Sequence, residues 1–352
     1  MALTQVQPGM LASDSQYTGF KNRLINSAMM IDQRNSGASV SIATTSDVYT
    51  LDRWAAAGQS ADGVFTVQQD TTVPTGYKNS MKITVTTADS SIGASQYYLM
   101  QQNIEGLNLP DLNWGTANAQ TVTLSFWVRS SLTGTFGGVF SNSAGNRSYP
   151  FSYTISSANT WTQISVTVAG DTSGTWLTDN SSGITLRFGL GVGSTFSGTA
   201  GAWAGSSYFS ATGATSVVGT NGATFYITGV QLEVGSSATG FEYRQYTNEF
   251  ALCQRYYQKA PITYGAAINT TTLGTCYDFP VVMRTTPTLA LLTTTPYAEI
   301  PLTTGYTASG ATIAGYSYAG GTGLTVTGFT GFTSGRAPIL LDNNQVSVSA
   351  EL

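Results

Sequence analysis

The sequence predicts an all-β protein: a jelly-roll-type β-sandwich, then one short linking helix and a small C-terminal β domain. Three observations lead to this. Apolar and polar residues alternate with period two through most of residues 20–232, as in antiparallel strands that bury one face. Turn-forming residues separate these runs. A helical pattern is confined to a few residues after Thr247, and the chain then returns to short apolar runs typical of strands.

Five runs in the first part of the chain carry the alternation most clearly, and many short strands of this kind predict two packed antiparallel sheets. Turn sequences at 171–174, 180–183 and 220–222 separate the later ones. The apolar positions of the five runs are Met81, Ile83 and Val85; Val122, Leu124, Phe126 and Val128; Ile164, Val166 and Val168; Ile184, Leu186, Phe188 and Leu190; and Phe225, Ile227, Val230 and Leu232.

These patterns divide the chain into four parts, which are an extended N-terminal arm (1–19), the sandwich (20–246), the linking helix (247–260) and the small C-terminal β domain (261–352). The arm is interpreted either as a disordered terminus or as a segment that docks on another chain. A connection at 193–222 is long for a loop and rich in Gly, Ala, Ser and Thr. It also contains aromatic residues, so a hairpin within it is one interpretation.

The helix is predicted from its end signals. Thr247 or Asn248 can cap its first turn, Glu249 suits the positive end of the helix dipole, and Pro261 stops it. Phe250, Cys253 and Tyr257 form one stripe, which we predict to be an oligomer contact around a three-fold axis, between the sandwich and the C-terminal domain, because so short a helix needs a partner. The alternative is packing on the sandwich of the same chain.

The last part of the chain is expected to form a small sheet. Its apolar runs include an alternating set at Phe279, Val281 and Met283 and a continuous one at 289–292. Later runs are centred on Leu324 and Val326, on 339–341, and on Val346 and Val348. Ninety residues suffice for a small β domain.

The composition excludes several classes of function. Charged residues make up only 9% of 352, so the protein either has neutral polar faces or buries its surface against copies of itself or a larger particle. The net charge is −4 and the 14 basic residues are dispersed, which argues against nucleic-acid binding. No apolar run is long enough to cross a membrane, and the N-terminus lacks a signal-peptide pattern. We expect synthesis in a host cytoplasm without signal-directed export.

The absence of histidine excludes Ser-His-Asp and Cys-His catalysis, His-ligated zinc and a His-based pH switch. Carboxylates remain as acid–base candidates. Asp171 and Asp179 flank Trp176, but Asp in such sequences typically supports a turn. Glu233 and Glu242 are interpreted as structural. We therefore predict that the protein is not an enzyme, and that no residue serves as a catalytic group.

The two cysteines are predicted to be free and buried, because a disulfide framework would need more of them in so long a chain. The alternative is a bond between Cys253 and Cys276.

Exposed aromatic side chains are the candidates for glycan binding, because the apolar face of a sugar stacks on an aromatic ring. Trp176, Trp203 and Tyr208 lie in predicted turns or in the long connection, which favours them over the other tryptophans. Trp127 falls on the polar face of its strand and is either covered by a loop or available. For each of these residues the alternative role is to anchor its own loop.

Several segments together carry a resemblance to a known class of protein. These are GVQLEVGSSATGFEYR (229–244), ALCQRYYQK (251–259), GFKNRLINSAMMIDQRNSGASV (19–40), YTLDRW (49–54), VTLSFWVRSS (122–131), FPVVMRTTPTLAL (279–291) and DNNQVSVSAEL (342–352). The chain resembles bacteriophage virion proteins of the tail-fibre-like type, in which a carbohydrate-binding-module-like β-sandwich precedes a small C-terminal β domain.

The resemblance implies a structural protein of the virion that forms a homotrimer, assembles with other virion proteins and contacts host-surface glycans. The alternatives are a capsid decoration or capsid fibre protein with no receptor role, a glycan depolymerase, and a free carbohydrate-binding module. No cofactor is expected. The resemblance also raises the alternative of a structural calcium ion near the first strand, with Asn26 and Asp32 as its ligands, although Ser27, Ala28 and Met29 depart from the usual pattern there.

Overall fold

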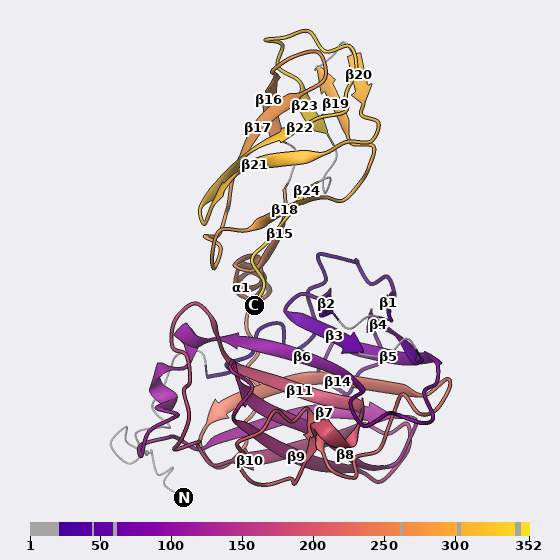
Figure 1. Ribbon diagram of the computed structural model, residues 1–352, viewed down its shortest axis with the longest axis vertical. Coiled ribbons are helices and arrows are strands. Elements are labelled where there is room, and N and C mark those ends of the chain that lie inside the picture. The colour runs from indigo at the N-terminus through magenta and orange to yellow at the C-terminus, as the bar shows by residue number, and fades with distance from the viewer. Residues whose placement is uncertain (1–20, 44–45, 59–61, 261–262, 301–303, 342–345) are drawn as a thin grey trace, which may run out of the picture. The chain divides into compact units, whose positions relative to one another are not determined.

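The computed structural model describes residues 21–43, 46–58, 62–260, 263–300, 304–341 and 346–352 (Figure 1). The chain divides into two compact units, Met1–Gln245 and Tyr246–Leu352. The predicted N-terminal arm lies outside the described residues. No helix among those residues is long and apolar enough to span a bilayer.

The first unit contains two six-stranded antiparallel sheets. The first sheet has the order β1(Val40–Ile42), β4(Val64–Asp70), β5(Ser80–Thr87), β14(Thr224–Val234), β7(Val122–Ser130) and β10(Thr162–Val168). The second has the order β2(Val48–Leu51), β3(Trp54–Gly58), β6(Tyr97–Glu105), β11(Ser182–Val192), β8(Gly134–Asn142) and β9(Ser148–Ile155).

The two sheets pack face to face around one core. Between β5 and β14 the chain passes repeatedly from one sheet to the other. Phe126 of β7 contacts Phe188 of β11 with ring centroids 5.1 Å apart, and Phe136 of β8 lies 6.1 Å from Phe225 of β14. The apolar positions of the alternating runs point into this core, and most are fully buried. The predicted fold class, an all-β jelly-roll-type sandwich, is confirmed.

The long connection at 193–222 does not form a hairpin. It contains η5(Ser194–Phe196) and two short strands, β12(Ser197–Gly198) and β13(Ser210–Ala211), which pair in parallel. Glycine lets this segment approach the outer face of the second sheet: a Cβ on Gly137 or Gly189 would lie 2.5–2.6 Å from Oγ of Ser210. The connection therefore covers part of that face with well-defined structure.

The second unit begins with α1(Tyr246–Gln254). A three-stranded sheet has the order β15(Tyr257–Lys259), β24(Val346–Ser349) and β18(Thr288–Leu291). A seven-stranded sheet has the order β20(Thr304–Thr307), β19(Tyr297–Ile300), β23(Ile339–Leu341), β16(Thr263–Ala267), β17(Leu273–Asp278), β22(Gly321–Val326) and β21(Ile313–Tyr318).

The helix is shorter than the predicted 247–260. Its last i→i−4 bond runs from the Arg255 N–H to the Ala251 carbonyl, and the chain then enters β15, which pairs with β24. Pairing with a distant strand outweighs local helix signals here because Tyr257 and Gln258 are buried in that sheet. Phe250 and Cys253 lie on α1, whereas Tyr257 lies on β15, so the three do not form one helical stripe.

Two further expectations for the second unit are wrong. Residues 279–283 do not form a strand, because Pro280 cannot donate to a ladder; Phe279 and Met283 instead pack with Val348 and Ala350. Both cysteines are free and Cys253 is buried, but Cys276 is exposed on β17.

Candidate functional site

Three tryptophans from separate segments of the first unit meet in one cluster, which we call the tryptophan cluster. The ring centroids of Trp114 and Trp176 are 4.8 Å apart, those of Trp114 and Trp203 5.2 Å, and those of Trp176 and Trp203 5.3 Å. The interplanar angles are 76–80°, so every pair packs edge to face. An edge-to-face pair uses only part of its ring surface, which leaves indole surface for a further partner.

The cluster has a buried member and two partly exposed ones. Trp114 is 7% exposed, whereas Trp176 and Trp203 are half-buried. Each indole N–H already donates within the protein, from Trp114 to Gln120 O, from Trp176 to Ser173 O and from Trp203 to Ala169 O. A ligand at Trp176 or Trp203 can therefore gain stacking and apolar contact from these rings, but no hydrogen bond from their nitrogens.

Short turns between β6 and β7 position Trp114. Two 3₁₀ turns, η3(Gly106–Asn108) and η4(Pro110–Leu112), lead to Asn113, which adopts a left-handed conformation with φ 52°. Gly115 follows with φ 86°, and its N–H donates to the carbonyl of Asp171. A Cβ on Gly115 would lie 2.7 Å from the carbonyl oxygen of Gly174, so a side chain here would push the two segments apart.

A partly buried ion pair holds the segment that carries Trp176. Arg147 donates from Nε and Nη2 to the two carboxylate oxygens of Asp171, at 2.7 and 2.6 Å. Asp171 is 1% exposed and also accepts the Ser173 N–H. The bidentate bond to Asp171 raises the pKa of Arg147 above its ordinary value. The turn at Gly174 lies against the aliphatic part of Arg147, so the pair fixes the start of this segment.

The two carboxylates that flank Trp176 do not make an acid–base pair. Asp171 is bound by Arg147, and Asp179 accepts the N–H of Ser181. That backbone hydrogen bond lowers the pKa of Asp179, the opposite of what a general acid for glycoside cleavage needs. Both residues serve turns, as the turn interpretation of the sequence predicts.

The remaining candidates lie elsewhere. Tyr208 is half-buried and packs over Gly198, and no ring contact joins it to the cluster in the described part of the chain. The candidate oligomer contacts Phe250, Cys253 and Tyr257 belong to the second unit; Cys253 and Tyr257 are buried and Phe250 stacks on Tyr246.

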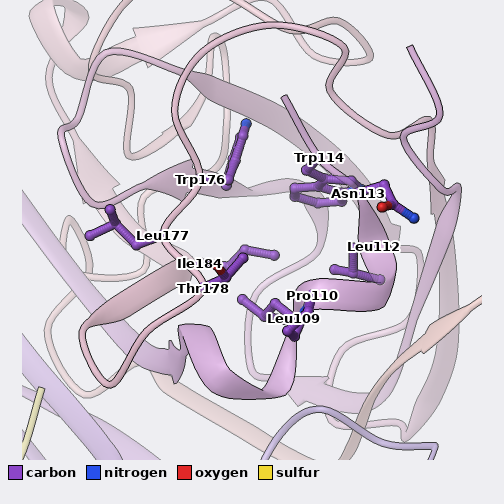
Figure 2. A pocket seen from close by; sticks show the side chains of 9 residues that line it. All are labelled: Leu109, Pro110, Leu112, Asn113, Trp114, Trp176, Leu177, Thr178 and Ile184. Atoms are coloured by element: carbon purple, nitrogen blue, oxygen red, sulfur yellow. The ribbon is translucent and has the colours of Figure 1, made fainter. Parts of the chain in front are cut away.

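A small hollow of about 30 Å³ opens beside Trp114 and Trp176 (Figure 2). Its buried lining is apolar, and polar side chains stand at its edge, namely Asn113 and Thr178, both exposed. The lining consists of Leu109, Pro110, Leu112, Asn113, Trp114, Trp176, Leu177, Thr178 and Ile184.

Sequence reasoning did not identify Trp114 or the hollow. Trp114 stands in DLNWG, between turn residues, and that context alone could have marked it as a loop aromatic. Its meeting with Trp176 and Trp203 depends on the sandwich bringing three connections together.

A second polar and aromatic group, on the outer face of the second sheet, was also missed. Arg187 of β11 donates to Gln101 and Ser141, and its guanidinium lies 4.8 Å from the ring centroid of Phe209. Burial lowers the pKa of Arg187 to about 10, opposed by the charge of Asp47. The signal in the sequence was a single charged residue in a largely apolar strand. Because the 193–222 connection covers this group, we interpret it as the anchor of that connection.

The two calcium candidates are engaged in hydrogen bonds of their own loop. Asn26 is fully buried; its amide donates to the carbonyls of Ile31 and Asp52, and its Oδ1 accepts the Ile31 N–H. Asp32 accepts the N–H groups of Asn35 and Gly37. In the described residues no group of three His, Cys, Asp or Glu side chains is placed to hold a metal. These side chains do not fit a calcium site, because amide groups occupy their oxygens.

Replacing Asn26 with Ala should therefore destabilise the protein by about 2 kcal/mol, because it removes the three buried hydrogen bonds that this amide makes to the backbone. Asn118→Ala, at an exposed position, is the control and should change little. Urea unfolding measures both. EDTA should leave the wild-type transition unchanged; a midpoint that falls in EDTA and returns with calcium would show that a metal supports this loop after all.

No protein-family model matches the sequence, and no curated protein matches it. Among solved structures, the enzymatically active domain of bacteriophage CBA120 tailspike protein 4 is 14% identical over 52% of this chain, with a TM-score of 0.29; the match spans only 19% of that domain. A family 11 carbohydrate-binding module of Clostridium thermocellum in complex with a mixed-linked tetrasaccharide is 11% identical over 55% of this chain and 95% of its own, with a TM-score of 0.29.

A family 4 carbohydrate-binding module is 13% identical over 60% of this chain and 98% of its own, again with a TM-score of 0.29. TM-scores this low do not establish a shared fold. The sandwich assignment therefore rests on the order and pairing of its own strands.

Proposed function

We propose that this protein is a non-enzymatic structural protein of a bacteriophage virion, of the tail-fibre-like type, whose sandwich binds host-surface glycan weakly at the tryptophan cluster. The observation that supports glycan binding is the partial exposure of two mutually packed indoles, Trp176 and Trp203. Their mutual packing and their used N–H groups hold the rings in place, so that little conformational entropy is lost when a sugar stacks on them. The virion half rests on the sequence resemblance.

The absence of cleavage follows from the same site. The carboxylates nearest to Trp176 in sequence are held in turn and ion-pair contacts, and the chain contains no histidine. Stacking on one ring contributes about 1 kcal/mol, which is about fivefold in affinity. Attachment would therefore depend on several copies acting together.

The test is retention of the protein on host cells and on host-surface polysaccharide. Trp176→Ala and Trp203→Ala should each weaken binding about fivefold while the far-UV spectrum is unchanged. Trp161→Ala is the matched control, because Trp161 is half-buried and contacts Tyr226, away from the cluster.

Each alternative function predicts a different outcome of the same experiment. New reducing ends that disappear in Asp171→Asn or Asp179→Asn would make the protein a depolymerase. Failure of the wild type to bind cells, combined with its location on the capsid by electron microscopy of intact particles, would make it a decoration or fibre protein of the capsid.

We also propose that the protein is a homotrimer made in the host cytoplasm and incorporated in the virion. A chain with 9% charged residues has little electrostatic protection against association. Sedimentation at micromolar concentration should show one species at three times the chain mass of 37.0 kDa. A monomer that persists as the concentration rises would contradict this.

A further inference from the structure

The hollow beside the tryptophan cluster has the size and polarity of a site for one methyl group. Its volume of about 30 Å³ exceeds what one water needs. Four of its lining side chains are buried and apolar or aromatic, and they form its floor: Leu109, Leu112, Trp114 and Ile184. Water gains few hydrogen bonds from such a floor, whereas a methyl group gains contact on several sides.

The edge of the hollow differs from its floor. The Asn113 amide nitrogen donates to the carbonyl of Asp111, and its Oδ1 accepts no hydrogen bond from the residues that the structure describes. Thr178 supplies an exposed hydroxyl on the opposite connection. Figure 2 shows these two side chains and the ring of Trp176 around the same hollow. A ligand group that ends in a methyl and carries a polar N–H next to it would match both floor and edge.

We infer that the site prefers N-acetylated amino sugars, with the acetamido methyl in the hollow and the sugar ring on the exposed surface of Trp176. This inference rests on the proposed glycan binding and specifies its ligand class. The acetamido N–H would donate to Oδ1 of Asn113, and the Thr178 hydroxyl would bond the acetamido oxygen or a ring hydroxyl. A hydroxyl in place of the acetamido group would leave the hollow unfilled.

The experiment compares chitotetraose with cellotetraose, which differ at C2 by an acetamido group in place of a hydroxyl. Binding is followed by tryptophan fluorescence and by broadening of ligand NMR signals. Burial of one methyl group should favour chitotetraose by at least about fourfold. Fluorescence alone is insufficient because the chain contains six tryptophans that contribute to the signal, so the ligand NMR signals supply the independent measurement.

Two variants test whether the preference for chitotetraose arises at the hollow. Thr178→Phe adds bulk at an exposed edge position and should abolish the preference for chitotetraose over cellotetraose. Asn113→Gly removes the Oδ1 acceptor, so the preference for chitotetraose should fall. Asn113 has φ 52°, a conformation that glycine adopts readily, so the fold should be retained. Trp161→Ala should leave the preference unchanged.

Four results decide the matter. A preference for chitotetraose that Thr178→Phe removes supports the inference. Equal binding of both oligosaccharides that depends on Trp176 overturns it and leaves the proposed glycan binding intact. Stronger binding of a 6-deoxy sugar such as L-fucose than of N-acetylglucosamine would overturn the acetamido assignment, because the hollow would then take a methyl of another kind. No binding of any of these sugars or of host polysaccharide would overturn both proposals.

Discussion

Trp114→Ala is expected to lower the free energy of unfolding by about 4 kcal/mol, since truncating a buried Trp to Ala removes its packing and leaves a cavity. Trp114 is 7% exposed, contacts both Trp176 and Trp203, and donates its indole N–H to the carbonyl of Gln120. Its loss should also release the two half-buried rings, so glycan retention should fall further than in either of their own alanine variants. Denaturation in urea measures the first effect and cell retention the second.

Two comparisons make this prediction specific. Trp114→Phe keeps an aromatic ring at the centre of the cluster and should cost less than Trp114→Ala. Trp161→Ala removes a half-buried indole whose ring neighbour is Tyr226 at 6.2 Å, so its cost should be much smaller. Equal stability losses in Trp114→Ala and Trp161→Ala would show that the cluster is not a packing centre.

Arg147→Met is expected to cost about 3 kcal/mol, because it leaves the carboxylate of Asp171 buried without its cation. Methionine retains much of the aliphatic packing against the turn at Gly174, so the loss reports the missing charge. Because this turn precedes Trp176, hydrogen exchange should accelerate in residues 171–178. Urea unfolding and exchange measured by NMR test the two parts.

A double variant separates the effect of losing the ion pair from the effect of losing the Arg147 side chain. Asp171→Asn combined with Arg147→Met removes the uncompensated charge and should recover part of the stability, as a double-mutant cycle would record. Arg129→Met is the matched control: Arg129 stacks on Tyr226 at 4.9 Å and donates to the carbonyl of Asn159, and in the described residues it forms no ion pair. That control should lose less than 1 kcal/mol. A loss as large as that of Arg147→Met would show that the effect does not come from the ion pair between Arg147 and Asp171.

Alternation along the sequence was a reliable guide to the strands of the first unit. Val122, Leu124, Phe126 and Val128 are all buried on β7, while Trp127 on the opposite face is half-buried. This pattern is local, because successive side chains in a strand point to opposite faces whatever the strand pairs with. It failed for β8, whose sequence GTFGGVFSN interrupts the alternation with glycines. Those glycines are required by tertiary contacts, such as that of Gly137 with Ser210.

In the second unit distant pairing outweighed local signals. The sequence correctly predicted a helix in this region, but α1 begins at Tyr246, so Thr247 and Asn248 lie within its first turn and not at the predicted cap position. The end of the helix is set by β24, which pairs with Tyr257–Lys259 in a sheet. The exposure of Cys276 likewise could not be read from its neighbours, since β17 pairs with β16 and β22 and presents this thiol outward. The order of strands in the sheets determines where the helix ends and whether Cys276 is exposed, and this order cannot be predicted from a short stretch of sequence.

The sequence by itself determined the all-β class, the inward faces of the main strands, the exclusion of histidine chemistry and the turn role of Asp171 and Asp179. The tertiary structure alone decided the site. Trp114, Trp176 and Trp203 lie in three different connections, and they meet because the sandwich brings the loops after β6, β10 and β11 together. The physical reason is that a loop's own residues specify its turns, whereas the packing of the strands around their shared core determines which other loops lie beside it.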